Sequence, residues 1–106
     1  MKSDQTESVY KLAAYAATRI LDNVLKGTNT INYHDGLSGS EIFADLKKGP
    51  TRDIVFNNLD IFDNCLNNLV FNRIEYLRAE GLVVVDKNQC CRIPTEAEME
   101  EFLSIE

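Results

Sequence analysis

Residues 66–95, LNNLVFNRIEYLRAEGLVVVDKNQCCRIPT, decide the fold of this chain. The segment begins with apolar side chains at helical spacing, which fall on one face of a helix at about 100° per residue: Leu66, Leu69, Val70, Ile74 and Leu77. Gly81 follows at the point where a residue in the left-handed conformation commonly ends a helix. The pattern therefore predicts a helix that stops at Gly81.

Two short β-type segments come after this glycine. Residues 82–85 form a β-branched run too short for a helix, and residues 90–93 return before Pro94, which cannot donate a ladder hydrogen bond. The connecting residues, DKNQ, favour a turn. We therefore expect an antiparallel hairpin packed against the helix. Thr95 and Glu98 then have the spacing of a capping box, which predicts a closing helix.

This order of helix, glycine, hairpin and threonine-capped helix resembles the winged helix-turn-helix domain, in particular regulators of the MarR and PadR kind. The residues that carry the resemblance are Leu77, Gly81, Leu82, the hairpin of residues 83–93 and Thr95. The resemblance covers the C-terminal half of the chain closely. In the N-terminal half, only the order of the helices and strands is similar. The resemblance implies a mainly α fold with a small β-hairpin, and a third helix and a wing that contact duplex DNA.

The N-terminal half supplies the remaining elements. Residues 8–26 have a helical pattern ended by Gly27, and residues 28–33 predict a short strand. Ser38 and Glu41 have the spacing of a second capping box, which would begin a short helix with Ile42, Phe43 and Leu46 on its apolar side. The expected order in a single domain of residues 1–106 is helix, strand, helix, helix, two-stranded wing and helix.

Residues 51–62 do not fit this order, because a winged helix allows only a turn of a few residues between its second and third helices. The segment TRDIVFNNLDIF contains six apolar side chains, five of them larger than valine. We expect it to form either an extra helical turn or an elongated third helix.

The first helix has more apolar surface than one core requires. Its apolar arc covers roughly 220° at 100° per residue, with these members: Val9, Tyr10, Leu12, Ala13, Ala14, Ala16, Ala17, Ile20, Leu21, Val24 and Leu25. The surplus predicts a second burial partner, either the closing helix or the same helix of another subunit. We therefore expect a homodimer through residues 8–26 and the C-terminal helix.

Composition narrows the class of protein. A chain of 106 residues with 44% hydrophobic and 26% charged residues is typical of one soluble domain, and no run of eighteen apolar residues indicates a membrane span. Three cysteines do not make a disulfide framework, so a reducing cytoplasm is expected, and the adjacent Cys90 and Cys91 should point to opposite faces of a strand. The sequence has none of the familiar motifs of catalysis or cofactor binding. It also lacks the ligand spacings typical of zinc sites, and His34 is the single histidine.

The charge is unevenly distributed. Residues 1–50 hold six basic and six acidic residues, whereas residues 51–106 hold five basic and eleven acidic residues and so carry the whole net charge of −6. The acidic half would contain the recognition helix and the wing, which conflicts with simple binding to phosphates.

Two functions follow from these observations. The first is a small DNA-binding regulator; the second is a winged-helix module that binds a basic protein partner or mimics nucleic acid.

In the third helix, the side chains expected to face outward are Asn64, Asn67, Asn68, Phe71 and Arg78. Asparagine can bind adenine, and Phe71 is either covered by a neighbouring segment or an interface anchor. The basic residues expected to contact phosphates are Lys47, Lys48, Arg52, Lys87 and Arg92.

Overall fold

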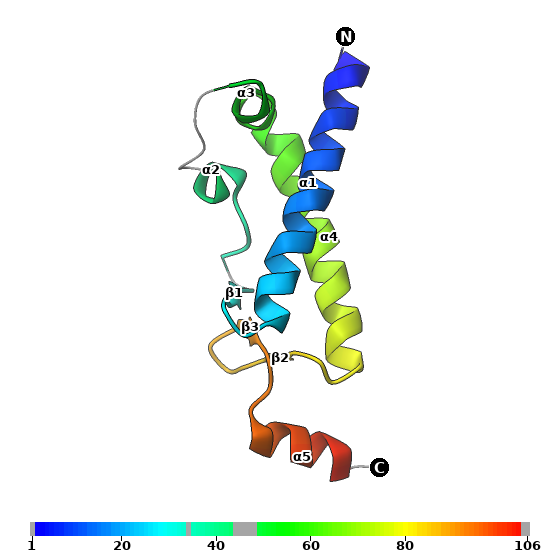
Figure 1. Ribbon diagram of the computed structural model, residues 1–106, viewed down its shortest axis with the longest axis vertical. Coiled ribbons are helices and arrows are strands. Elements are labelled where there is room, and N and C mark those ends of the chain that lie inside the picture. Colours follow the sequence, from blue (N-terminus) through cyan, green and yellow to red (C-terminus); the bar gives the residue numbers. More distant parts are fainter. Residues whose placement is uncertain (1, 34, 44–48, 105–106) are drawn as a thin grey trace.

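The computed structural model describes residues 2–33, 35–43 and 49–104. Five helices and three short strands follow one another in the described residues (Figure 1): α1 (Lys2–Leu25), β1 (Ile31–Asn32), α2 (Gly39–Ile42), α3 (Pro50–Phe56), α4 (Leu59–Ala79), β2 (Val84–Val85), β3 (Cys90–Arg92) and α5 (Glu96–Ser104). The expectation of a mainly helical protein with a small antiparallel sheet is confirmed. The molecule is elongated, with extents of 54 × 25 × 21 Å.

The two long helices, α1 and α4, run side by side in the same direction and form the body of the molecule (Figure 1). Their facing sides make the core, which consists mainly of aliphatic residues and one phenylalanine: Val9, Ala13, Ala16, Ala17, Val24, Phe62, Leu66, Val70, Ile74 and Leu77. Burial stabilises by about 1.5–3 kcal/mol for each of the larger of these side chains and by less for each alanine, so this parallel pair is the main source of stability.

Residues 51–62 form both structures that the sequence left open. Pro50 occupies the first turn of α3, where its missing N–H costs no hydrogen bond. The side-chain amide of Asn58 donates to the carbonyl of Ile54 over 2.8 Å, which terminates α3. The next helix, α4, then begins at Leu59, seven residues before Leu66, where the quoted apolar pattern starts.

The sheet has the strand order β1-β3-β2, and both pairs are antiparallel. Ile31 pairs with Cys91, and Val85 pairs with Cys91 from the other side. Cys91 is fully buried and Cys90 is half-buried, as the alternation along a strand predicts. The expected hairpin and the expected strand in residues 28–33 are therefore both confirmed.

Gly81 ends α4 in the left-handed conformation, with φ at 76°. The N–H of Gly81 donates to the carbonyl of Arg78 over 3.0 Å, and the N–H of Leu82 donates to that of Leu77 over 2.9 Å. These bonds satisfy carbonyl groups at the helix end and direct the chain into β2.

The prediction of a capping box at Ser38 is wrong. The Ser38 hydroxyl bonds to the Ser40 hydroxyl over 2.8 Å and makes no cap hydrogen bond, and α2 is only four residues long. The Asp63 carboxylate of α4 instead accepts from the N–H of Gly39 over 2.7 Å. Gly39 lies so close to the Phe62 ring that an added Cβ would be 2.7 Å from it, so a glycine is required for this contact. Leu46 is outside the described residues.

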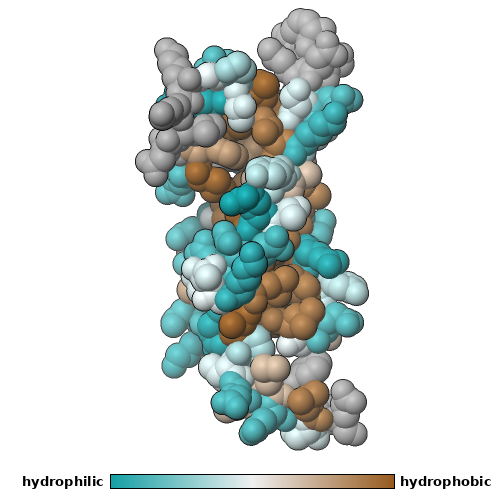
Figure 2. Space-filling model, viewed as in Figure 1, coloured by the Kyte–Doolittle hydropathy of each residue, from teal (hydrophilic) through white to brown (hydrophobic). Residues whose placement is uncertain are grey.

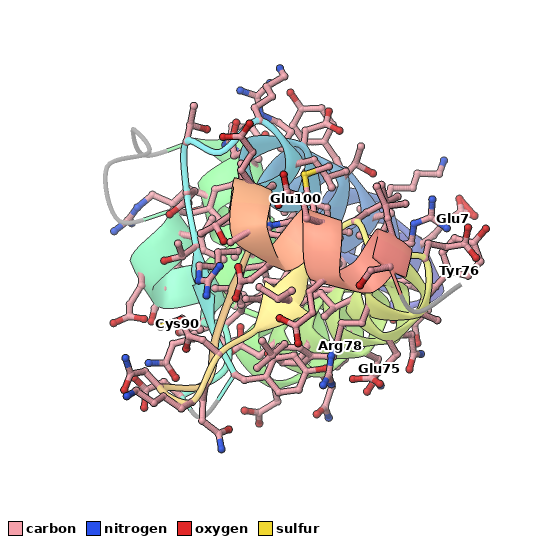
Figure 3. The ribbon with its side chains drawn as sticks, turned by 90° about the horizontal axis from the view of Figure 1, so that it is seen from below. Glu7, Glu75, Tyr76, Arg78, Cys90 and Glu100 are labelled. Atoms are coloured by element: carbon pink, nitrogen blue, oxygen red, sulfur yellow. The ribbon has the colours of Figure 1, made fainter. Side chains whose placement is uncertain are left out.

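The capping box at Thr95 is confirmed. The N–H of Glu98 donates to the Thr95 hydroxyl over 3.2 Å, and the N–H of Thr95 donates to the Glu98 carboxylate over 2.8 Å. The helix that follows, α5, lies across the lower end of the molecule (Figures 1 and 3). It does not cover the surplus apolar arc of α1, because Tyr10 and Ala14 are exposed.

Candidate interaction surface

The arginine of the wing does not present a free guanidinium. Arg92 lies between two carboxylates: its Nε is 3.2 Å from Asp86, and its two terminal nitrogens are 2.8 and 3.1 Å from Glu98. These contacts hold the pKa of Glu98 down to about 2 and raise the pKa of Arg92. Backbone N–H donors, led by Cys90, lower the pKa of Asp86. Arg92 thus joins the hairpin turn to α5.

Arg78 is also bound to a carboxylate. Its guanidinium lies 3.3 Å from Glu75, one turn earlier on α4, and the two side chains lie together at the lower end of the helix (Figure 3). Glu75 additionally accepts a short hydrogen bond from the Tyr33 hydroxyl, which lowers the pKa of Glu75. Desolvation, followed by the bond to Glu75, raises the pKa of Tyr33 to about 12.

Phe71 is covered by a neighbouring segment, the first of its two expected environments. Its ring lies edge-on to that of Tyr33, with the ring centroids 4.8 Å apart. Because β1 directly precedes Tyr33, this contact fixes the end of the sheet on α4. Phe71 is therefore part of the packing and is not an exposed anchor.

Asn67 does not face outward as expected. Its side-chain oxygen accepts from the N–H of Leu37 over 2.8 Å, and its amide donates to the carbonyls of Leu37 and Asp63 over 2.9 and 2.7 Å. These bonds hold the loop before α2 against α4 and leave the amide unsuited to reading a base. Asn64 and Asn68 are exposed, as expected.

The remaining expected phosphate contacts are dispersed. Lys87 is exposed in the hairpin turn, and Arg52 of α3 stacks 4.4 Å from the centre of the Phe56 ring. Lys47 and Lys48 lie outside the described residues. Among the residues that the structure describes, it therefore does not gather the basic residues that were expected to contact phosphates.

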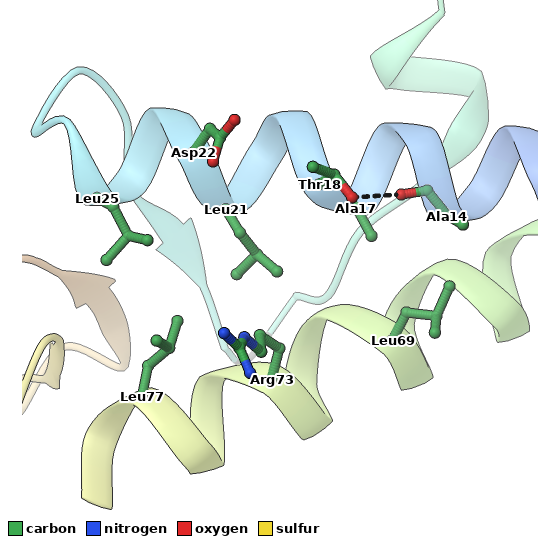
Figure 4. A pocket seen from close by; sticks show the side chains of 9 residues that line it. All are labelled: Ala14, Ala17, Thr18, Leu21, Asp22, Leu25, Leu69, Arg73 and Leu77. Atoms are coloured by element: carbon green, nitrogen blue, oxygen red, sulfur yellow. Dashed lines mark hydrogen bonds between the residues drawn. The ribbon is translucent and has the colours of Figure 1, made fainter. Parts of the chain in front are cut away.

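A groove along the seam of α1 and α4 is a feature that the sequence did not predict. Its lower part has a volume of about 400 Å³. Apolar side chains from both helices point into it (Figure 4), and the complete lining is Ala14, Ala17, Thr18, Leu21, Asp22, Leu25, Leu69, Arg73 and Leu77. The space-filling view shows an apolar patch over this lower half of the pair, bordered by hydrophilic side chains (Figure 2).

A second hollow of about 410 Å³ continues the groove upward. It shares Leu69 with the lower part and is lined by Tyr10, Ile61, Asn64, Cys65, Asn68 and Leu69. Tyr10 is 51% exposed, and Ile61 and Leu69 are each 40% exposed. The two hollows together form one mainly apolar surface along most of the helix pair, and we call this surface the α1/α4 groove.

The polar groups of the α1/α4 groove are few. The Thr18 hydroxyl donates to the carbonyl of Ala14 over 3.0 Å, so its hydrogen-bonding capacity is used within the helix (Figure 4). The Arg73 guanidinium lies over the Tyr76 ring, 4.7 Å from its centroid, and Asp22 lies at the α1 edge. A ligand of this surface would therefore be mainly apolar, with a few charged groups at its border.

Leu69 corrects the sequence prediction for the third helix. It has the spacing of a core residue, but it lies in the groove between the helices and is substantially exposed. Ile61 and Cys65 belong to the same surface and were not predicted as functional residues. Their spacing of four residues with Leu69 is the sequence signal for a second apolar face on α4.

Other kinds of site find no support in the described part of the chain. Within residues 2–33, 35–43 and 49–104, there is no cluster of three histidine, cysteine or acidic residues that could hold a metal ion. None of the described helices is long and apolar enough to cross a membrane. Comparison with known proteins gave no matching family model, curated protein or solved structure.

Proposed function

We propose that this chain is a protein-interaction module of the winged-helix type that binds an amphipathic helix in the α1/α4 groove. The observation that carries the proposal is the groove itself, where exposed side chains such as Tyr10, Ile61 and Leu69 line one continuous surface. Apolar grooves between helices commonly accept the apolar face of another helix, whose anchors recur every three or four residues. Contiguous exposed apolar surface is also a frequent mark of protein contacts.

The winged-helix assignment is supported by the order and pairing of the elements. A long helix ends at Gly81 and leads into the β2–β3 hairpin, and β1 completes a three-stranded antiparallel sheet. α5 follows the hairpin directly. In this interpretation α4 occupies the place of the recognition helix, but its apolar groove, rather than a base-reading surface, is its functional face.

Electrostatics also favour a protein partner over duplex DNA. Arg78 and Arg92 are bound to carboxylates, and the exposed surface of α4 includes Asp60 and Glu75. DNA binding requires several free cations that displace counterions from phosphates. The groove lining carries one cation and one anion, Arg73 and Asp22, so it suits a mainly apolar partner helix with charges of both signs at its border.

Duplex DNA is the second candidate, since one observation favours it. Lys87 is exposed in the hairpin turn, the position from which a wing contacts phosphates. With Arg52, Lys47 and Lys48 it would supply the backbone contacts, and Asn64 and Asn68 of α4 would face the bases. Reversing the charge of Lys87 would then weaken binding to all sequences alike.

The first experiment selects α-helical peptides from a displayed random library against the protein at low micromolar concentration. Peptides that use the groove should lose binding to Leu69→Glu and keep binding to Leu103→Glu, which changes an equally apolar but distant exposed residue of α5. Peptides that bind both variants equally, or a failed selection, would contradict the proposal.

The second experiment is a mobility shift with random-sequence duplex DNA at low and high salt. The proposal predicts no shift at either salt concentration. A shift that weakens steeply as salt rises, and that Lys87→Glu reduces, would favour the DNA-binding candidate instead.

A further inference from the structure

We propose that the α1/α4 groove is occupied by a second copy of this chain, packed antiparallel so that two α1 helices and two α4 helices form a four-helix bundle. This inference rests on the proposed function, because it names the partner of the same groove. It is carried by the order of sizes and charges along the side of α1 that lines the groove.

The sizes of the side chains on this side are complementary to themselves. Placing a two-fold axis between Ala17 and Thr18 sets Ala14 of one copy opposite Leu21 of the other, and Ala17 opposite Thr18. Tyr10 then faces Leu25 of the second copy at both ends of the contact. All of these residues except Tyr10 line the lower groove, and Tyr10 lines its upper part. Small side chains near the axis allow two helices to approach closely, and the large ones fill the ends.

The charges distinguish the antiparallel arrangement from a parallel one. Lys11 and Asp22 differ by eleven positions, or about three turns, so they lie on the same edge of the exposed side. Around the same two-fold axis, Lys11 of each copy lies near Asp22 of the other, which gives two opposite-charge pairs. A parallel two-fold arrangement would place Lys11 of one copy and Asp22 of the other on opposite edges and at different heights, so it would form neither pair. Edge charges of this kind set the orientation of paired helices.

The contact that Lys11 already makes does not prevent this pairing. Lys11 lies 3.7 Å from Glu7 on its own helix, and both side chains are largely exposed, at 78% and 69%. Surface ion pairs of this kind contribute little to stability, so Lys11 can readily pair with another carboxylate instead.

The second long helix adds apolar contacts in the same arrangement. Because α4 runs parallel to α1, the axis brings Leu69 close to the Arg73 stem of the second copy and Cys65 close to its Leu77. Each of these side chains lines the groove in the single chain. The Arg73 head is directed onto Tyr76, so its aliphatic stem is the part available for packing.

The oligomeric state is the first test. Sedimentation velocity at high micromolar concentration should give a dimer for the unchanged protein and a monomer for Ala14→Glu, which places a carboxylate in the contact. The matched control Ala97→Glu changes an exposed alanine of α5 and should remain dimeric. A monomer for the unchanged protein would overturn the inference. Circular dichroism verifies that both variants are folded.

A charge exchange tests the orientation without touching the apolar residues. Lys11→Glu and Asp22→Lys should each weaken the dimer by about three- to tenfold, because each change creates two like-charge pairs. The double variant should restore the original dissociation constant. Additive weakening in the double variant would overturn the antiparallel arrangement.

Cysteine cross-linking gives an independent measure of the register. In a Cys65→Ser background, an oxidised mixture of Tyr10→Cys and Leu25→Cys chains should give a mixed disulfide dimer, whereas either variant alone should not cross-link through the new cysteine. Cross-linking of each variant with itself would indicate parallel helices and overturn the inference. If the protein is monomeric but still binds selected helical peptides in a Leu69-dependent way, the inference fails and the proposed function stands.

Discussion

Arg92 and Glu98 form a two-point ion pair, in which the two terminal guanidinium nitrogens lie 2.8 and 3.1 Å from the two carboxylate oxygens. The same Glu98 accepts from the N–H of Thr95, so one carboxylate both caps α5 and binds the sheet. Since Arg92 also contacts Asp86, the hairpin turn, β3 and α5 are joined by one side chain. The position of α5 should therefore depend on the charge of Glu98.

The attachment of α5 is expected to weaken in acid. The folded state lowers the pKa of Glu98 from 4.5 to about 2, so this stabilisation is complete above about pH 4.5 and is lost as the pH falls toward 2. The protection of the α5 amides against hydrogen exchange, relative to the intrinsic rate at each pH, should fall over this range in the unchanged protein. Glu98→Gln should exchange rapidly at every pH. Equal protection of α5 in the two proteins at pH 6 would contradict the role given to this carboxylate.

The ionisation of Tyr33 is expected to occur at unusually high pH. Burial and the hydrogen bond to Glu75 raise its pKa from 10.0 to about 12, so the associated stability is present below pH 10 and lost as the pH rises through about 12. Ultraviolet titration should show a late-ionising tyrosine, and Tyr33→Phe should remove it. In Glu75→Gln the late component should move toward 10. A late component that persists in Tyr33→Phe would refute the assignment.

Asn67→Ala should destabilise the protein by about 1–3 kcal/mol, because it leaves the N–H and carbonyl of Leu37 without their side-chain partner. Urea denaturation measures this difference. Asn68→Ala is the matched control, since Asn68 is exposed and should change the free energy of unfolding by less than about 0.5 kcal/mol. Equal effects of the two substitutions would show that Asn67 has no special structural role.

Gly81→Val should cost at least about 1 kcal/mol, because β-branched residues resist the positive φ of 76° at this position. Gly81→Asn should cost less, since asparagine tolerates the left-handed conformation. Thermal denaturation followed by circular dichroism compares the two. An unchanged melting temperature for Gly81→Val would be inconsistent with the observed helix end.

Much of the C-terminal half could be predicted from the sequence, because its signals act between near neighbours. The helix end at Gly81, the hairpin and the capping box of Thr95 and Glu98 each depend on residues within a few positions of one another. The capping pattern of Ser38 and Glu41 is also local, but the capping box that it predicted does not form. There, Asp63 from a distant helix supplies the acceptor for Gly39, and α2 is too short to need a cap of its own.

The functional surface depended on longer-range packing. Helical periodicity showed that α1 has a surplus apolar arc, but it could not show which part the rest of the chain covers. Leu69 has the spacing of a core residue and lies in the groove, whereas Asn67 has the spacing of a surface residue and binds the Leu37 loop. Sequence alone determined the end of α4 at Gly81, the hairpin and the capped start of α5, because these choices are made by local backbone geometry and capping. The tertiary structure decided which faces stay exposed, because that depends on how α4 aligns beside α1 across the 33 residues between them.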